Sequence, residues 1–191
     1  MSGDNKERIS GLEKKRKNNK RQEILEAALQ VVEADGANHL TINAVAEKSG
    51  FSKGGVLYHF ASKNALLSSM IEYLIGANQS RMDEAALKGQ GFLSALIDAE
   101  SRMSEKERRA SLAMLAAAAE NAELVLPAKV YMKEVFNAIH QESDGDEDAT
   151  LLFLANEGLR YLEVLGLTPL KSQELRRIRA HMQKKAAGLK S

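Results

Sequence analysis

The sequence predicts an all-α protein of about nine helices, because its composition and its apolar spacing both favour helix. Alanine, leucine, glutamate and lysine dominate the 191 residues, and aromatic residues make up only 5% of them. Apolar residues recur at helical spacing, and no convincing run of alternating β-branched residues indicates a strand. Only two prolines, Pro127 and Pro169, interrupt the chain.

Length, charge and cysteine content limit the possible classes of protein. A chain of 191 residues can form one small and one medium domain. Its formal net charge of +1 does not by itself indicate nucleic-acid binding. The absence of cysteine excludes disulfides and thiolate metal sites and suits a reducing cytoplasm. No stretch is apolar enough to span a bilayer and no signal-peptide pattern opens the chain, so we expect a cytoplasmic protein without a membrane partner.

The most specific segment runs from Thr41 to Leu67 and predicts two short helices, a tight turn between them and the start of a third helix. Thr41 and Ser52 are predicted N-caps of the two short helices, and Ser62 is the predicted N-cap of the next helix. Gly50 is placed to adopt the positive φ that ends a helix. This order predicts a helix-turn-helix, whose second helix enters a groove of DNA.

Two adjacent glycines, Gly54 and Gly55, stand inside the second short helix. Each glycine in a helix costs roughly 1 kcal/mol relative to alanine, so stability alone does not explain the pair. Without side chains at these positions, the helix backbone can come close to a DNA backbone or to a base edge. A close contact between two helices, or a plain loop, is the alternative explanation.

Few side chains in this helix can read bases. No Arg, Asn or Gln lies between Ser52 and Phe60, although these residues make most bidentate base contacts. We therefore predict that specificity depends on Lys53 at a guanine, on a thymine-methyl or backbone contact near the glycines, and on DNA shape. Hydroxyl and lysine side chains around the helix would instead anchor phosphates. The candidate DNA-binding residues are Thr41, Asn43, Ser52, Lys53, Gly54, Gly55, Tyr58, His59 and Lys63.

One set of residues across this segment has a characteristic order and spacing: Thr41, Ala46, Gly50, Ser52, Gly54, Leu57, Tyr58, Phe60, Lys63 and Leu66. The set resembles the N-terminal signature of the TetR family of bacterial transcriptional regulators. The resemblance covers residues 20–70 and departs from the family pattern at Asn64, where an acidic residue is usual, and at Phe51, where valine is commoner. It implies a DNA-binding head on a helical body, a homodimer, and most often a repressor that a small molecule releases from a palindromic operator. A protein of this kind is expected to be nucleoid-associated.

The resemblance and the local composition together predict four segments. Residues 1–19 are polar, lack an apolar helical face and are expected to form a disordered basic arm, which would contact DNA or only aid solubility. Residues 20–67 form the predicted helix-turn-helix head, and residues 68–89 form a connecting helix and hinge. Residues 90–187 form the predicted effector-binding and dimerisation body. The basic residues of the arm and its junction are Lys14, Lys15, Arg16, Lys17, Lys20 and Arg21.

The last two predicted helices carry apolar stripes that would form a dimer interface. Ala155 and Gly158 are small, which would let a partner helix approach. Two short reading helices related by a dyad would read a palindrome whose half-sites lie about one helical turn apart. Alternatively, the stripes only cover the core of the monomer. The candidate interface residues are Leu151, Leu154, Ala155, Gly158, Leu159, Leu162, Leu165, Leu175, Ile178 and Met182.

The resemblance also implies a site in the body for a small apolar or amphipathic effector. Its binding would shift the body helices and pivot the helix that begins at Ser62, so that the two heads of a dimer no longer fit successive major grooves. An ordinary core position explains any single one of the candidate lining residues better. These candidates are Phe92, Met103, Met114, Asn121, Tyr131 and Phe136.

Enzymatic function finds little support in the sequence. The four histidines lack metal-ligand spacing, and no GxSxG, P-loop or GxGxxG motif is present, so neither a metal nor a cofactor is expected. Two other classes stay open. One is a TetR-like DNA-binding protein whose body binds a protein partner instead of a small molecule. The other is a helical interaction module that does not bind DNA.

Overall fold

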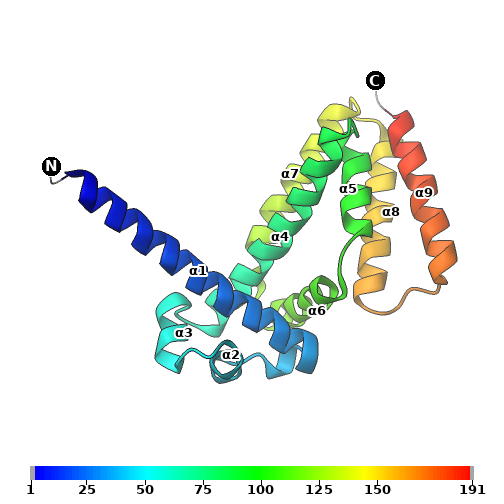
Figure 1. Ribbon diagram of the computed structural model, residues 1–191. Coiled ribbons are helices and arrows are strands. Elements are labelled where there is room, and N and C mark those ends of the chain that lie inside the picture. The colour runs from blue at the N-terminus through cyan, green and yellow to red at the C-terminus, as the bar shows by residue number, and fades with distance from the viewer. Residues whose placement is uncertain (1–2, 190–191) are drawn as a thin grey trace.

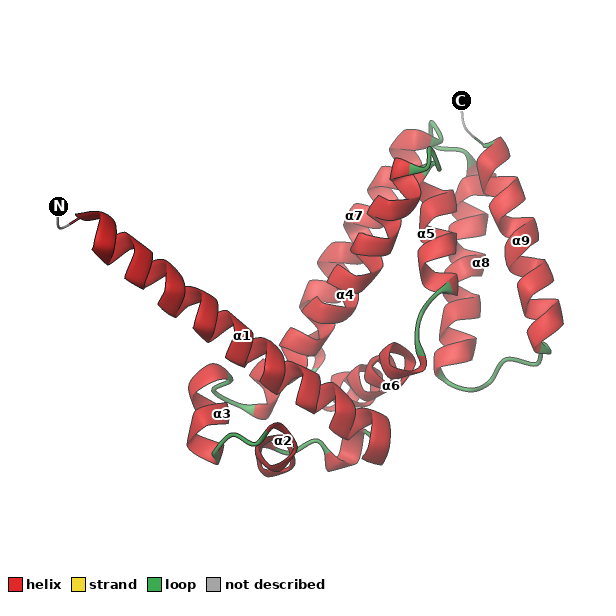
Figure 2. Ribbon diagram, in the orientation of Figure 1, coloured by secondary structure: helices red, strands yellow, loops and turns green. Residues whose placement is uncertain are grey.

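The computed structural model describes the backbone of residues 3–189 and the side chains of residues 17–189, except that of Ala37. Within these residues the chain forms nine α-helices, two short 3-10 helices and no strand (Figures 1 and 2). The all-α prediction and the predicted number of helices are therefore confirmed. None of the helices in this part of the chain is long and apolar enough to cross a membrane.

Helix α1 (Gly3–Asp35) begins much earlier than the sequence predicts. Because residues 3–19 continue this helix, the expectation of a disordered arm is wrong for them. Lysine, arginine and glutamate have good helix propensity, and a helix that packing nucleates elsewhere is extended at little cost. An apolar stripe accompanies the helix only after Lys20, so a search for amphipathic spacing misses the extension. The side chains of Lys14, Lys15 and Arg16 lie outside the described residues.

Short helices complete a head that packs against the second half of α1 (Figure 1). They are η1 (Ala37–His39), α2 (Ile42–Ser49) and α3 (Lys53–His59). Together with the first turns of α4 (Lys63–Leu87), they enclose a first hydrophobic cluster. Its most deeply buried large members include Ile24, Leu29, Val45, Val56 and Phe60.

The body consists of the rest of α4 and the helices that follow it. These are α5 (Phe92–Ser101), α6 (Glu105–Glu120), η2 (Ala122–Val125), α7 (Leu126–Glu142), α8 (Glu147–Val164) and α9 (Ser172–Gly188). Figure 1 shows α7 alongside α4, with α5, α8 and α9 next to them. A second hydrophobic cluster joins α4, α5, α7, α8 and α9. Gly89 adopts a φ of 78° and turns the chain between α4 and α5, at the predicted hinge.

Helix α6 follows the hinge in sequence but packs on the head. Its buried residues Ala110, Ala113 and Met114 belong to the first hydrophobic cluster, with side chains of α1 and α4. Arg109 on the same helix donates a hydrogen bond to the backbone carbonyl of Glu33 in α1. A movement of α6 would therefore reach the head directly, in addition to any movement of α4.

Candidate DNA-binding surface, internal cavity and dimer face

The helix-turn-helix has the caps that the sequence predicts. The hydroxyls of Thr41, Ser52 and Ser62 each accept a hydrogen bond from the backbone N–H three residues later, at 3.1, 3.0 and 3.1 Å. These bonds begin α2, α3 and α4, respectively. Gly50 ends α2 in the left-handed conformation, with a φ of 72°. The turn between α2 and α3 is therefore fixed by local chemistry.

Helix α3 buries Val56 in the head and leaves most of its other surface open. Tyr58 is 71% exposed, and Lys53 and Gly54 are exposed as well. A Cβ atom added at Gly54 would meet no atom within 4 Å. No helix–helix contact within the described chain therefore requires glycine at this position.

The second glycine has a different local role. A Cβ atom added at Gly55 would lie 3.3 Å from the Ser52 hydroxyl oxygen, the atom that caps α3. Gly55 therefore leaves room for the cap of its own helix. The predicted DNA-binding residues Thr41, Asn43 and Lys63 are also exposed.

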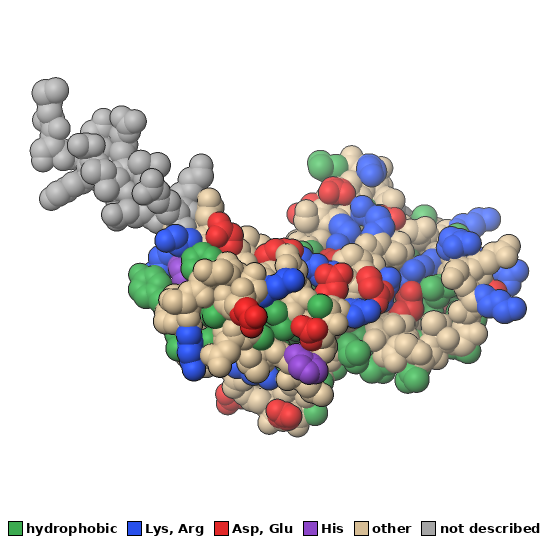
Figure 3. Space-filling view, turned by 60° about the horizontal axis from the view of Figure 1, so that its bottom comes forward, with side chains coloured by type: hydrophobic (Ala, Val, Ile, Leu, Met, Phe, Trp, Pro, Cys, Tyr) green, Lys and Arg blue, Asp and Glu red, His purple; other side chains and the backbone are tan. Residues whose placement is uncertain are grey.

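Basic residues of α1 lie beside the end of α3. The Lys17 ammonium lies 5.0 Å from the centre of the Tyr58 ring, and the Arg21 guanidinium lies 4.9 Å from the centre of the Phe60 ring. Figure 3 shows Lys and Arg side chains on this part of the head next to a histidine and to exposed apolar groups. Only the tertiary fold brings α1 and α3 together, so the spacing of residues in the sequence does not reveal this contact.

His59 lies partly buried under this basic cluster. Its Nδ1 atom is buried and has no hydrogen-bond partner among the described residues. Burial lowers the pKa of His59 below 6.5, and the charges of Lys17, Lys20 and Arg21 lower it further. The imidazole is therefore neutral at neutral pH, and a nearby phosphate would favour its protonation.

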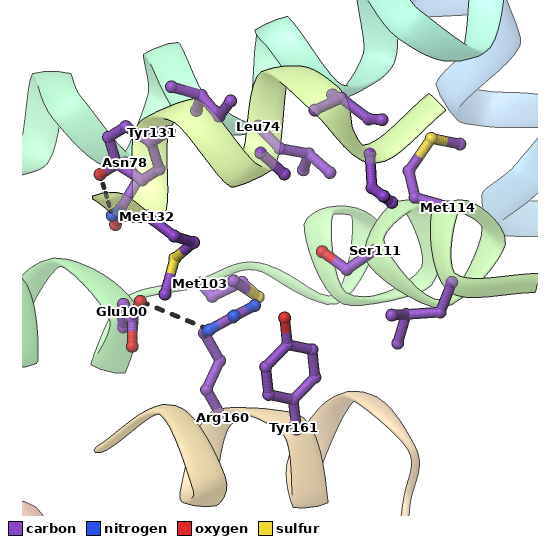
Figure 4. Close-up of a pocket in the computed structure, with 15 residues that line it drawn as sticks. Leu74, Asn78, Glu100, Met103, Ser111, Met114, Tyr131, Met132, Arg160 and Tyr161 are labelled. Atoms are coloured by element: carbon purple, nitrogen blue, oxygen red, sulfur yellow. Dashed lines mark hydrogen bonds and ion pairs between the residues drawn. The ribbon is translucent and has the colours of Figure 1, made fainter. Parts of the chain in front are cut away.

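A cavity of about 150 Å³, partly open to solvent, lies in the body (Figure 4). Met114 and other residues of the first hydrophobic cluster line one part of the cavity. Tyr131 and Met132, which pack against the second cluster, line another part. The cavity thus lies between the two clusters, against both α4 and α6. Its apolar lining residues are Ile71, Leu74, Ile75, Met103, Met114, Leu115, Val125, Ala128 and Met132. Its polar lining residues are Asn78, Glu100, Ser111, Tyr131, Arg160 and Tyr161.

Charged side chains meet at one end of the cavity. The Arg160 Nε atom lies 3.4 Å from Glu100 Oε1 and 3.0 Å from Glu157 Oε2. Asn156 Nδ2 donates a hydrogen bond of 2.6 Å to the other oxygen of Glu100. Figure 4 shows Arg160 and Tyr161 entering the cavity from α8, opposite Leu74. Burial raises the pKa of Glu100 well above 4.5, and the charge of Glu157 raises it further.

The structure places only part of the predicted pocket at this cavity. Met103, Met114 and Tyr131 line it, whereas the other three candidates do not. The backbone N–H of Phe92 donates to the Glu142 carboxylate, and the Asn121 side chain caps η2. Phe136 is exposed and packs against Phe153, with the ring centres 5.9 Å apart. Sequence periodicity cannot distinguish residues that line the cavity from those that pack elsewhere. It also does not indicate that charged residues face inward.

Most of the predicted dimer stripe lies on the surface of α8 and α9. Leu151 and Leu154 are 62% and 57% exposed. Three of the predicted residues instead belong to the monomer core, because Leu159 and Met182 are buried in the second cluster and Leu175 packs against it. The exposed members are Leu151, Leu154, Ala155, Gly158, Leu162, Leu165 and Ile178. An apolar stripe of this extent on a surface indicates an interaction site.

Comparison with solved structures supports the fold. The multidrug-binding protein EbrR in complex with ethidium superposes with a TM-score of 0.61 and 20% identity, covering 85% of this chain and 97% of that one. A TetR-family member from Streptomyces coelicolor superposes with a TM-score of 0.65 and 19% identity, over 90% of this chain and 98% of that one. At this level of identity the similarity establishes the fold alone.

Sequence comparison supports the family. An uncharacterized helix-turn-helix transcriptional regulator of Bacillus subtilis, YerO, is 29% identical over 153 residues, which are 78% of this chain and 52% of YerO. The nucleoid occlusion factor SlmA of Vibrio atlanticus is 36% identical over 69 residues, 36% of this chain and 35% of SlmA. The match thus spans about half of the first relative and about a third of the second.

Two family models match the head and the body separately. Residues 24–70 match the model for bacterial regulatory proteins of the tetR family. Residues 90–187 match the model for the C-terminal domain of tetracyclin repressor-like proteins. With the capped helix-turn-helix and the helical body, these matches show that the chain belongs to the TetR family of bacterial transcriptional regulators.

Proposed function

We propose that this regulator binds a palindromic operator as a homodimer, represses transcription and is released by a small-molecule effector. The single observation that carries the proposal is the exposed face of α3. There, a Cβ atom added at Gly54 would meet no atom of the described residues within 4 Å, and Lys53 and Tyr58 are exposed. The capped start of α3 and the basic residues of α1 beside it suit a helix that enters the major groove between phosphates.

The exposed stripe on α8 and α9 supports dimerisation. One short α3 touches few bases, whereas two copies related by a dyad double the contact and add the avidity of a bivalent binder. The stripe lies on the body, and Figure 1 shows α8 and α9 well separated from α3 in space. A partner molecule could therefore cover the stripe without covering the reading helix.

The position of the cavity supports an effector. Its wall includes α4, which leads into the head, and α6, which shares the hydrophobic cluster of the head. A ligand that binds one arrangement of α4 and α6 more tightly than another would shift the equilibrium toward that arrangement. This shift would change the spacing of the two heads in the dimer. EbrR, which has the same fold, was solved with ethidium, and this supports a small-molecule role for the cavity.

Loss of phosphate contacts gives the first test. DNA selected from a random pool by the purified protein provides the operator, and fluorescence anisotropy measures affinity at several salt concentrations. We expect Tyr58→Ala and Lys63→Ala each to weaken binding by about tenfold. Lys63→Ala should also reduce the slope of log affinity against log salt concentration by about one, as expected for the loss of one phosphate contact. Lys88→Ala, at the far end of α4, is the matched control and should change neither quantity. Unchanged affinity in both head variants would contradict the assignment of α3.

The buried state of His59 gives a pH prediction. The pKa of His59 is below 6.5 in the free protein, and a phosphate beside it would raise this pKa. Binding would then take up a proton, so operator affinity should rise as the pH falls through the higher pKa and level off below the lower one. Anisotropy titrations across this range should show that His59→Gln removes this part of the pH dependence. His39→Gln should leave it unchanged; the same pH dependence in His59→Gln as in the wild type would exclude His59 as its source.

A further inference from the structure

We infer that the cavity binds a small amphipathic monocation, such as an organic ammonium, whose charged nitrogen lies against the Glu100 carboxylate. This inference rests on the proposed function, because it takes the cavity as the effector site, and it adds the sign of the effector's charge. Three observations support the inference: the charge balance of the cavity, an unpartnered hydrogen-bond acceptor in its wall, and its size.

At the polar end of the cavity, the lining residues Glu100 and Arg160 are joined by a second carboxylate, that of Glu157, which lies beside the cavity and does not line it. Glu100 and Glu157 both contact Arg160, and each of the two glutamates is only 7% exposed. With both carboxylates ionised, this group carries one uncompensated negative charge away from water, which is costly. A monocation in the cavity would neutralise that charge, whereas an anion would add to it.

Two arginines on other helices around α5 do not supply the missing positive charge, because each is paired with another carboxylate. On α4, Arg81 is paired with Glu107 at 2.8 Å, and on α9, Arg179 is paired with Glu163. On α7, burial raises the pKa of Tyr131, so its hydroxyl stays neutral at physiological pH. The charge balance therefore depends on Glu100 and Arg160, on the adjacent Glu157, and on what the cavity contains.

The same cavity offers a hydrogen-bond acceptor that no described group uses. Asn78 lines the cavity and is 7% exposed. Its Nδ2 donates to the Tyr131 hydroxyl oxygen at 3.0 Å, whereas its buried Oδ1 has no partner (Figure 4). A buried carbonyl oxygen needs a donor. An acceptor, a carboxylate and an apolar wall in one cavity match a protonated amine on an apolar group.

Size and wall chemistry narrow the class further. A volume of about 150 Å³ is that of an engineered protein cavity that admits benzene, so the rigid cavity suits a ligand with a single ring. Met103, Met114 and Met132 in the wall are flexible side chains that permit modest widening. The ring of Tyr131 offers a further favourable contact to a cation, whereas the Arg160 guanidinium already lies 4.3 Å from the centre of the Tyr161 ring.

Cation binding would be coupled to the loss of a proton from Glu100. In the empty cavity, burial and the charge of Glu157 favour the protonated form of Glu100. A bound cation favours the carboxylate, so the proton leaves the Glu100 oxygen for the solvent and no other covalent bond changes. Affinity for a cation should therefore rise with pH through the raised pKa, with at most one proton released per ligand.

Isothermal titration calorimetry with three probes of similar size and different charge tests the inference on the full chain. The probes are benzylamine, which stays protonated over the range used, neutral benzyl alcohol, and benzoate. The titrations run between about pH 6 and pH 8. We expect benzylammonium to bind at least about tenfold more tightly than benzyl alcohol at the upper pH, with a smaller preference at the lower pH. Benzoate should not bind.

Glu100→Gln is the decisive variant, because it keeps the shape and an oxygen acceptor for Asn156 but removes the charge and the proton. It should lose the preference for benzylammonium, the pH dependence of that preference, and the release of a proton on binding. Titrations in buffers of different ionisation enthalpy measure the proton release. Glu120→Gln makes the same chemical change at an exposed glutamate that does not line the cavity, and it should retain all three. The fold of Glu100→Gln can be checked independently. Because the folded pKa is raised, wild-type stability falls as the pH rises above 4.5 through that pKa, and the Tm of the variant should fall less.

Three outcomes would overturn the inference: equal affinity for charged and neutral probes, binding of no probe, or an unchanged preference in folded Glu100→Gln. Anisotropy with the selected DNA runs in parallel, so that failures can be separated. A protein that prefers benzylammonium but binds no DNA contradicts the proposed function. A protein that binds DNA and shows no preference for the cation contradicts the charge inference alone.

Discussion

Replacing Leu154 and Leu162 with glutamate is expected to give a folded monomer whose operator affinity is lower by about 100-fold or more. Both side chains are exposed on α8, so the substitutions remove nothing from the core of the monomer. Four carboxylates would face one another across the proposed dyad. Their like charges would be buried in an apolar interface away from water, which opposes dimerisation. Analytical ultracentrifugation measures the mass, circular dichroism measures the fold, and anisotropy measures operator binding.

A matched control separates the dimer stripe from surface leucines in general. Leu87 and Leu126 are also exposed, and they lie on α4 and α7 instead of α8 and α9. The double variant Leu87→Glu and Leu126→Glu should therefore keep the wild-type mass and operator affinity. A dimer that survives substitution of Leu154 and Leu162 would place the interface elsewhere.

Gly54→Ala is expected to stabilise the protein and to weaken DNA binding at the same time. Alanine is favoured over glycine in a helix by roughly 1 kcal/mol, and the added Cβ would meet no atom of the described residues within 4 Å. On the proposed function, the same methyl group would stand between α3 and the DNA. We expect operator affinity to fall by about tenfold or more, which corresponds to roughly 1.4 kcal/mol. Thermal unfolding and anisotropy measure the two effects.

Gly76→Ala provides the control for the helix effect. Gly76 lies within α4, is exposed, and also has no atom within 4 Å of an added Cβ. It should raise the Tm in the same way as Gly54→Ala without changing affinity for the operator. If Gly54→Ala stabilised the protein and bound DNA as the wild type does, close approach of the backbone could not explain the glycine.

Local signals allowed much of the head to be predicted. The caps at Thr41, Ser52 and Ser62 and the left-handed turn at Gly50 depend on residues within a few positions of one another, so sequence spacing encodes them. The extension of α1 to Gly3 has no such signal. A charged helix without an apolar stripe shows only propensity, which a search for periodicity ignores.

The cavity was the least predictable part, for a physical reason. Glu100 and Arg160 are separated widely in sequence, and charged side chains on an amphipathic helix are ordinarily assigned to the solvent face. Only their mutual pairing makes burial tolerable, and that pairing is a tertiary contact. Apolar periodicity likewise cannot distinguish Met114, which lines the cavity, from Leu159, which fills the core.

The packing of α6 on the head has a consequence for cooperativity and for modular exchange. A fragment that ended at Leu87 would lose Ala110, Ala113, Met114 and Leu124, which complete the first hydrophobic cluster. Such a fragment would expose apolar surface of α1 and α4, so the DNA-binding head should not fold as an autonomous unit. Head and α6 should melt together in one transition. A chimaera that joined this head to another body would need a matching α6 as well as a matching α4.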